Sequence, residues 1–325
     1  MNKVKWGILG CGDVTEQKSG PAFNKVKNSE LVAVMRRTTS KAKDYAERHG
    51  ISKWYDQAGE LIDDSEVNAI YIATPPDAHL EYVKKVAAAG KPVYVEKPMA
   101  RTYAECQEMI EVCQKADVPL FVAYYRRSLP YFLKVKEMLE NGAIGKPLLV
   151  NIQLYQPPRS EDLNMEELPW RVKPEISGGG YFMDMAAHQL DLLDFFFGPA
   201  VEVKGLVSNR RGLYKVEDTI SASFKFESGL IANGSWCFVS DDLNKLDKME
   251  IQGTKGRIVF SGFDFSPVLI ETEDEKEEFD MPKPAHIQQP MIQSIVNELT
   301  GQGESPSKGE SAARTNLMID QITGK

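Results

Sequence analysis

Short apolar runs alternate with amphipathic segments along the first part of the chain. The runs are rich in β-branched and aromatic side chains, which is typical of buried strands, and the segments between them show helical spacing of apolar residues. Strands are predicted at residues 4–9, 31–35, 54–55, 69–73, 93–95 and 119–123. Helices are predicted at residues 39–49, 78–89 and 103–116, and another is expected to start near Pro21. Strands that alternate with helices predict an α/β fold with a doubly wound parallel sheet, the Rossmann arrangement.

Strands predominate after Ala123, where the alternation ends. They are predicted at residues 148–154, 201–208, 218–226, 230–238, 248–252 and 256–260. Helices are predicted at residues 132–140, 181–197, 286–300 and 310–322. A run of strands that follows an alternating half predicts a second, α+β domain with a large, mostly antiparallel open sheet.

Alternation in one of these strands predicts which face of the second sheet is covered. One face of residues 218–226 carries Ile220, Ala222, Phe224 and Phe226. The other face carries Thr219, Ser221, Ser223 and Lys225. The predicted helices are too few to cover both faces of the sheet. We expect the apolar face to lie on the helix at 181–197 and the polar face to contact a second copy of the chain in a homo-oligomer.

Composition excludes several classes of protein. A hydrophobic content of 42% with 26% charged residues is ordinary for a globular protein and argues against extended disorder. The net charge of −8 argues against nucleic acid or an anionic membrane as a partner, because both require a basic patch. We interpret the acidic run at residues 271–280 as a solvated strand edge or loop, not as a metal site. Residues 1–3 lead directly into a strand too short for a signal sequence, so we expect a cytoplasmic protein.

A glycine-rich turn follows the first strand. Gly10-Cys11-Gly12-Asp13-Val14-Thr15 is similar to a dinucleotide-binding loop, in which the first glycine permits the turn and the second lets the backbone approach a pyrophosphate. Thr15 replaces the third glycine of that pattern, so a tight structural turn is the alternative interpretation. The candidates for contact with a dinucleotide are Gly10, Gly12, Asp13 and Val14.

The end of the second strand is basic where an acidic residue commonly binds the ribose of NAD. The run Met35-Arg36-Arg37-Thr38-Thr39-Ser40-Lys41 contains no carboxylate. Guanidinium groups bind phosphate through two parallel hydrogen bonds, so the run predicts a site for the 2′-phosphate of NADP, and NADP is expected in preference to NAD. An exposed basic turn is the alternative. The candidate residues are Arg36, Arg37, Ser40 and Lys41.

Two more strands end in residues suited to the same edge of the sheet, where ligands bind in open parallel sheets. After the strand at 69–73, Asp77 is expected to cap a helix, and His79 either lies near a cofactor or packs at the helix start. After the strand at 93–95 comes a lysine that the following proline biases away from helix. The candidates at these two strand ends are Thr74, Pro75, His79, Glu96, Lys97 and Pro98.

A helix in the second half carries an acid and a histidine on one face. Asp184 and His188 are spaced i, i+4 within residues 181–197, directly after Gly178-Gly179-Gly180. Such a pair can act in acid–base catalysis, with the carboxylate orienting the imidazole. A buried histidine satisfied by its neighbours is the alternative. A metal site is disfavoured because no further His or Cys lies nearby in the sequence.

Together these motifs resemble the glucose-fructose oxidoreductase / inositol dehydrogenase family (Gfo/Idh/MocA) of NAD(P)-dependent dehydrogenases, over nearly the whole chain. The resemblance implies that Lys97 is the family's essential lysine, that His188 and Asp184 are its catalytic partners, and that Glu96 and Pro98 shape the nicotinamide site. It also implies dimer contacts through the second sheet. The residues for which it implies contacts with substrate or nicotinamide are Tyr125, Arg126, Arg127, Trp170 and Arg171.

We therefore expect an NADP-dependent oxidoreductase that transfers a hydride between nicotinamide and a sugar or polyol. Residues 1–123 would bind the dinucleotide, residues 124–284 would bind substrate and form the oligomer, and residues 285–325 would pack back on the body. Two alternatives stay open: a glycoside-cleaving enzyme with a tightly held cofactor, and a non-catalytic dinucleotide sensor. Whether Lys97 or His188 carries the proton is not decided by the sequence.

Overall fold

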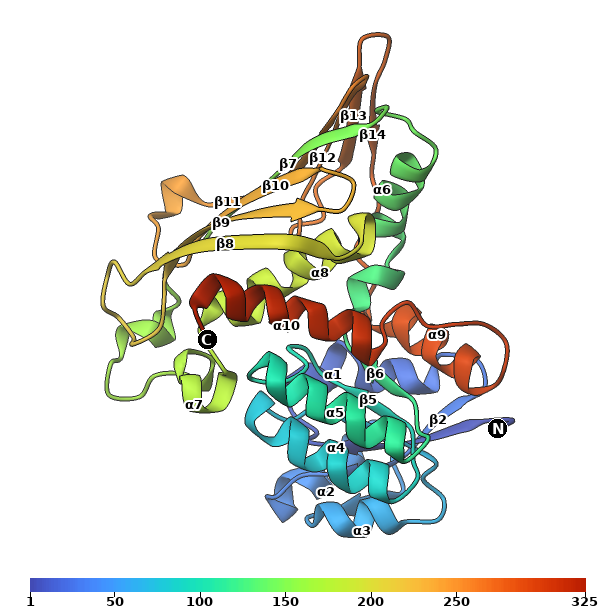
Figure 1. Ribbon diagram of the computed structural model, residues 1–325. Coiled ribbons are helices and arrows are strands. Elements are labelled where there is room, and N and C mark those ends of the chain that lie inside the picture. Colours follow the sequence, from blue (N-terminus) through green and yellow to red (C-terminus); the bar gives the residue numbers. More distant parts are fainter. The chain divides into compact units, whose positions relative to one another are not determined.

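The apolar runs of the first half form a six-stranded parallel sheet in the computed structural model, which describes residues 1–325 (Figure 1). The strand order is β3-β2-β1-β4-β5-β6, so the predicted doubly wound sheet is confirmed. The strands are β1 (Val4–Leu9), β2 (Ser29–Met35), β3 (Lys53–Tyr55), β4 (Ala69–Ile72), β5 (Val93–Val95) and β6 (Leu120–Val122).

Helices connect these strands. They are α1 (Asp13–Gln17), α2 (Thr39–His49), α3 (Ala58–Asp63), α4 (His79–Ala88) and α5 (Tyr103–Lys115). The helix expected near Pro21 instead begins at Asp13, because Thr15 closes a turn onto Gly12 at once, and Pro21 lies in a short 3₁₀ turn. The prediction of Asp77 as a cap was also wrong, since Asp77 lies inside a 3₁₀ turn that precedes α4.

Three strands of this sheet end level with one another. Leu9 at the end of β1 pairs with Ile72 of β4, and Ile72 pairs with Val95 of β5. Ladder hydrogen bonds continue one residue further, from Ala73 N to Leu9 O at 2.8 Å and from Glu96 N to Ile72 O at 2.9 Å. The loops that begin at Gly10, Ala73 and Glu96 therefore leave the sheet at one edge.

An eight-stranded sheet forms the second half, in the order β14-β13-β12-β11-β7-β10-β9-β8. Its neighbours are antiparallel except β7 and β10, which run parallel. The strands are β7 (Pro147–Tyr155), β8 (Ala200–Ser208), β9 (Thr219–Phe226), β10 (Ile231–Cys237), β11 (Leu246–Gly253), β12 (Gly256–Phe260), β13 (Val268–Thr272) and β14 (Lys276–Phe279). The acidic run at 271–280 thus lies in the β13–β14 hairpin at the sheet edge, where charge discourages pairing with another chain.

The two faces of β9 differ as their alternation predicts. Ile220, Ala222, Phe224 and Phe226 are buried, whereas Ser221, Ser223 and Lys225 are exposed. The Phe226 ring lies 5.7 Å from that of Phe197 in α8 (Ala187–Phe197), so the apolar face packs on this helix. The polar face is open in the single chain.

The predicted helix at 181–197 is continuous but not uniform. Residues Phe182–Ala186 form a π turn that leads into α8. The other helices of this half are α6 (Pro130–Glu140) and the short α7 (Pro174–Ser177). The two predicted C-terminal helices are α9 (Gln289–Leu299) and α10 (Gly309–Thr323).

The chain divides into two units that do not follow one another in sequence. The first consists of Met1–Leu129 and Pro284–Ala313, and the second of Pro130–Lys283 and Arg314–Lys325. The first segment of the first unit ends at Leu129. Arg127, near this end, donates a hydrogen bond of 3.2 Å to the carbonyl oxygen of Pro306 in the second segment of the same unit. None of the helices is both long and apolar enough to cross a membrane.

Candidate active site

The glycine-rich turn leaves room beside its backbone. Gly10 has a φ of +92°, and a Cβ there would lie 2.8 Å from the Thr74 methyl group, so only glycine fits. At Gly12, by contrast, a Cβ would find no heavy atom nearer than the Gly10 carbonyl oxygen at 3.9 Å. This open space next to the backbone is what the close approach of a pyrophosphate requires, so the turn fits a dinucleotide.

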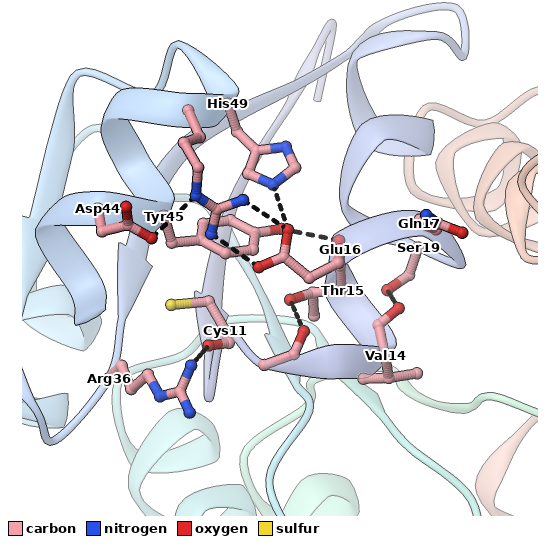
Figure 2. Close-up of polar contacts among 12 residues, drawn as sticks. Cys11, Val14, Thr15, Glu16, Gln17, Ser19, Arg36, Asp44, Tyr45 and His49 are labelled. Atoms are coloured by element: carbon pink, nitrogen blue, oxygen red, sulfur yellow. Dashed lines mark hydrogen bonds and ion pairs between the residues drawn. The ribbon is translucent and has the colours of Figure 1, made fainter.

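Thr15 closes the turn in place of the missing third glycine. Its backbone N and its hydroxyl both donate to the Gly12 carbonyl oxygen, at 2.9 and 2.8 Å. Its own carbonyl oxygen accepts a hydrogen bond of 2.8 Å from the Tyr45 hydroxyl (Figure 2). The close backbone approach is provided by Gly20, where a Cβ would lie 2.2 Å from the Thr15 carbonyl oxygen. Thr15 therefore replaces the third glycine of the usual pattern without loss of the close packing, because Gly20 allows the close approach instead.

An ionic cluster fastens α1 to α2. The Arg48 guanidinium donates two hydrogen bonds of 2.8 Å to the Glu16 carboxylate. The His49 ring nitrogen Nε2 lies 2.9 Å from the same carboxylate (Figure 2). The hydrogen bonds from Arg48 are the main reason that the pKa of Glu16 falls to about 2. The His49 ring stacks on Tyr45, with centroids 4.2 Å apart. The cluster holds the helix that follows the glycine turn, although Asp13 itself is exposed and Val14 is half-buried.

Arg36 bridges the end of β2 and the glycine turn. Its Nη1 donates to the Cys11 carbonyl oxygen at 3.2 Å, so the guanidinium is held at the turn (Figure 2). Burial raises the pKa of the Cys11 thiol to about 11. Arg37, Ser40 and Lys41 are exposed on the same segment. The structure thus brings Arg36 to the glycine turn and leaves the other three candidates open to solvent.

An acid that the local sequence did not reveal lies near this basic segment. Asp56 directly follows β3, whose last residue Tyr55 pairs with Met35 at the end of β2. The Asp56 carboxylate accepts a hydrogen bond of 2.6 Å from the Thr39 hydroxyl at the start of α2. The run from Met35 to Lys41 has no carboxylate of its own, but the fold supplies one.

His79 is the candidate whose surroundings favour the structural alternative. It is fully buried at the start of α4, where its Nδ1 lies 3.0 Å from the Met99 carbonyl oxygen and its Nε2 lies 2.8 Å from that of Thr74. Burial lowers its pKa. Both ring nitrogens therefore face the backbone, and His79 joins the loop after β4 to the loop after β5. Thr74 and Pro75 remain half-buried at the sheet edge.

The loop after β5 presents Lys97 at the same edge. Glu96 and Pro98 are buried and Lys97 is half-buried, with a cis peptide bond between Lys97 and Pro98. The Lys97 backbone N donates to the Glu96 carboxylate at 3.2 Å. Because β1, β4 and β5 end level, the glycine turn, Thr74 and Lys97 begin loops along one edge of the sheet.

The basic turn after β6 is buried. Tyr125, Arg126 and Arg127 lie in a 3₁₀ turn, and the Arg126 guanidinium lies over the Tyr125 ring at 5.2 Å. Arg127 reaches the Pro306 carbonyl oxygen, as described above. Arg127 therefore has an evident part in joining the C-terminal segment to the first unit.

In the second unit, Asp184 forms an ion pair that we did not expect. The Arg171 Nε lies 3.2 Å from the Asp184 carboxylate, and the Arg171 guanidinium also lies over the Trp170 ring at 4.6 Å. Trp170 and Arg171 share a 3₁₀ turn, whereas Asp184 lies in the π turn before α8. The ion pair joins two elements, and only the family resemblance had drawn attention to Arg171.

His188 is buried near the start of α8, with its ring 5.9 Å from that of Phe263 in an edge-on arrangement. The glycines before the π turn are required by close packing. At Gly180, a Cβ would lie 2.5 Å from a methyl group of Val216, and at Gly179 it would lie 2.9 Å from the Met183 Cβ. π turns in α-helices often occur at functional sites, and this one carries Asp184 just ahead of His188.

Comparison with known proteins identifies the family to which this chain belongs. Residues 4–124 match the model of an oxidoreductase family with an NAD-binding Rossmann fold, and residues 132–259 match a Gfo/Idh/MocA C-terminal domain. The chain belongs to the Gfo/Idh/MocA family. It is therefore an NAD(P)-dependent dehydrogenase or reductase, in a family of sugar and polyol oxidoreductases.

Relatives of this family align along most of the chain. "Oxidoreductase P35" from Formosa agariphila is 39% identical over 323 residues, which is 99% of each chain. Myo-inositol 2-dehydrogenase from Thermotoga maritima is 30% identical and covers 78% of this chain and 74% of its own. Among solved structures, levoglucosan dehydrogenase in complex with NADH and levoglucosan matches with a TM-score of 0.86 at 21% identity, over 99% of this chain and 96% of that one. These comparisons give no support to the glycoside-cleaving enzyme or to the sensor.

Proposed function

We propose that this protein is an oxidoreductase that prefers NADP and transfers a hydride between nicotinamide and a hydroxyl or carbonyl group of a sugar or polyol. The observation that carries the cofactor preference is the Arg36 guanidinium, which is tied to the Cys11 carbonyl oxygen at the glycine turn. One of its nitrogens is used there, and guanidinium groups bind phosphate well through their remaining donors. Arg37, Ser40 and Lys41 add charge and hydroxyl groups on the same exposed segment.

The same elements account for how the cofactor would be held. Gly10 permits the tight turn and Gly12 leaves space beside the backbone for the pyrophosphate. Asp13 and Val14 follow at the start of α1, and Thr74 and Pro75 lie at the same sheet edge. Glu96 and Pro98 would shape the nicotinamide site through the loop that carries Lys97. His79 would contribute indirectly, by holding the loops after β4 and β5 together.

The proposed reaction transfers one hydride and one proton. In the oxidative direction the substrate carbon gives its hydride to the nicotinamide, the hydroxyl group gives up its proton, and a carbonyl group is formed. The Lys97 ammonium group would hold the reacting oxygen. His188 would exchange the proton, because imidazole is the side chain suited to proton exchange near neutral pH. Asp184 lies four residues before His188 and is held by its ion pair with Arg171. Its carboxylate would supply negative charge to the imidazole.

The substrate class rests on the relatives, whose names refer to myo-inositol and levoglucosan. The substrate contacts proposed for Tyr125, Arg126, Arg127, Trp170 and Arg171 rest on the family resemblance. We also propose that the enzyme is cytoplasmic and that it forms a homo-oligomer through the open polar face of the second sheet, which carries Ser221, Ser223 and Lys225.

A substrate panel tests this function. Sugars and polyols, and the corresponding carbonyl compounds, are offered with NADP(H) and with NAD(H), and the reaction is followed at the nicotinamide absorbance. Turnover of at least one compound, faster with the phosphorylated cofactor and absent in Lys97→Met, is the expected result. A chain that binds either dinucleotide but turns over no member of the panel in either direction would contradict the proposal.

A further inference from the structure

A buried carboxylate lies beside the proposed catalytic lysine and is surrounded by hydrogen-bond donors. Oε1 of Glu96 accepts hydrogen bonds from the Tyr71 hydroxyl and, at 2.6 Å, from the Gln288 side-chain amide. Oε2 accepts from the Lys97 backbone N at 3.2 Å. Only 7% of Glu96 is exposed, so these donors replace the water that the carboxylate loses on folding.

Gln288 reaches this carboxylate from a distant part of the sequence. It is fully buried just before α9, and its backbone N donates to the Lys18 carbonyl oxygen at 3.1 Å. Its side-chain oxygen accepts a hydrogen bond of 2.7 Å from the Tyr94 hydroxyl. The two ends of the amide therefore have different partners: its nitrogen donates to Glu96, and its oxygen accepts from the Tyr94 phenol.

Both tyrosines are fixed as donors. Burial raises the pKa of Tyr71 and of Tyr94 well above the usual value, so both stay protonated. Their rings stack with centroids 4.8 Å apart on neighbouring strands β4 and β5. The hydrogen bonds therefore run in one direction, from Tyr94 through Gln288 to Glu96, which in turn accepts from the Lys97 backbone.

Apolar side chains of similar size would stabilise this part of the core about as well as the polar network does, because a buried polar network stabilises only when each of its members has a hydrogen-bond partner. This network has two further properties. It ends on the backbone of Lys97, and its central member also touches the carbonyl oxygen of Lys18, just after the short helix that follows the glycine turn. Gln288 thus connects the glycine segment to the lysine loop.

We propose that Gln288 is a positioning residue for the reaction: its amide holds the Glu96 carboxylate, which sets the backbone of Lys97. The inference rests on the proposed role of Lys97 in hydride transfer. It assigns a positioning role to Gln288, which the glycine and lysine motifs do not include. The other titratable group near the Glu96 charge is His79, which burial keeps toward the neutral form by lowering its pKa.

Three variants test the proposal. Gln288→Leu removes the amide, and we expect kcat to fall about tenfold to a hundredfold while the dinucleotide Kd changes less than about threefold, because the backbone contact with Lys18 is retained. Gln293→Leu is the control, since Gln293 lies in α9, the helix that Gln288 precedes, and forms hydrogen bonds with Lys27 and Asn297, not with Glu96. It should behave as the wild type. Wild-type kcat in Gln288→Leu would overturn the proposal.

The third variant, Gln288→Glu, separates positioning from simple stabilisation. Two facing carboxylates can share one proton, so the pKa of the new group should be raised. At a pH below that raised pKa the new carboxyl group is protonated and can donate to Glu96, so the hydrogen-bond chain is kept. The chain is lost as the pH rises through that pKa. We expect activity close to wild type at acid pH and a steep loss toward alkaline pH. A pH profile parallel to that of the wild type, with a constant reduction, would contradict the proposal. This variant also serves if Gln288→Leu does not fold.

A measurement without substrate separates this inference from the proposed function. The rate at which the Lys97 amine is reductively methylated by formaldehyde and cyanoborohydride is followed by peptide mass spectrometry in the folded protein. Gln288→Leu should change that rate at Lys97 by about threefold or more, and Gln293→Leu should not. Equal rates in all three proteins would overturn the positioning role even if the enzyme is active. A changed rate in a protein that turns over no sugar would refute only the proposed function.

Discussion

The Thr39 hydroxyl donates a hydrogen bond of 2.6 Å to the Asp56 carboxylate, beside the basic segment that follows β2. A carboxylate in this place repels a 2′-phosphate. Asp56→Asn keeps the hydrogen bond and removes the charge, so NADP(H) should bind more tightly by up to about 1 kcal/mol, as is usual for charges in contact with solvent. Calorimetric titration with both cofactors measures the change. Asp63→Asn, an exposed acid of α3, is the control, and equal effects from the two variants would remove Asp56 from cofactor discrimination.

Arg36 should carry most of the preference for NADP(H). Arg36→Asp is expected to reverse it, with a loss of about 1–3 kcal/mol in NADP(H) binding, since a charge-assisted hydrogen bond is replaced by repulsion. Arg36→Lys keeps the charge without the forked geometry and should give an intermediate result. Equal affinities of the unmodified protein for NADP(H) and NAD(H) in calorimetry would show that the segment after β2 does not discriminate.

Lys97→Met and His188→Ala should each abolish turnover and leave dinucleotide affinity nearly unchanged. Both side chains are proposed to act on the reacting hydroxyl or carbonyl group, so their loss affects kcat and not the binding of the adenine half. Steady-state kinetics and fluorescence titration with the cofactor give the two quantities. Lys245→Met, an exposed lysine, controls for loss of charge. A variant that keeps most of its turnover would exclude its residue from the mechanism.

The Glu16 cluster predicts a specific dependence of stability on pH. The pKa of Glu16 is about 2 in the folded chain and about 4.3 in an unfolded one. A lowered pKa contributes stability that is present above the unfolded value and is lost as the pH falls through the folded value. Since a third of this side chain is exposed, the contribution should be about 0.5–1 kcal/mol. Urea unfolding of Glu16→Gln should show this deficit at neutral pH, and the deficit should vanish toward pH 2. A deficit that is constant over this range would contradict the assignment.

The open polar face of β9 should mediate self-association. Ser223→Arg places a long charged side chain at the centre of that face and should shift an oligomer toward monomer in sedimentation at micromolar concentration. Ser65→Arg, the same substitution at an exposed site of the first unit, should leave the assembly unchanged. A wild-type protein that sediments only as a monomer at micromolar concentration would refute the proposed oligomer.

The sequence predicted those parts of the fold that depend on local pattern. The strands of the parallel sheet follow from continuous apolar runs, because both faces of that sheet are buried. The two faces of β9 follow from alternation, because side chains on one face of a strand repeat every second residue. The acidic run at 271–280 was interpreted as a strand edge or loop, but β13 and β14 were not predicted as strands. The apolar run of β13 is only three residues long, Val268 to Ile270, and three of the four residues of β14 are charged. The π turn around Asp184 was missed because helical spacing does not distinguish it from an α-helix.

For the site, local motifs indicated the residues and not their partners. Gly10, Lys97 and His188 stand out in the sequence, and the resemblance added Arg171. The contacts of Arg171 with Asp184, of Asp56 with Thr39 and of Gln288 with Glu96 join residues from different elements. Such contacts depend on how the chain folds back on itself, and the spacing of residues in one stretch carries no information about them.

The division of the chain has a consequence for its synthesis. The first unit takes its last residues from Pro284–Ala313, which include Gln288, whereas the intervening Pro130–Lys283 belongs to the second unit. Until Gln288 has left the ribosome, Tyr94 and Glu96 lack a buried partner that the finished fold gives them. The parallel sheet can form earlier, but its polar interior cannot be completed. A nascent or truncated chain that ends after Leu129 should therefore stay loose around the lysine loop until the residues from Pro284 onward have been made.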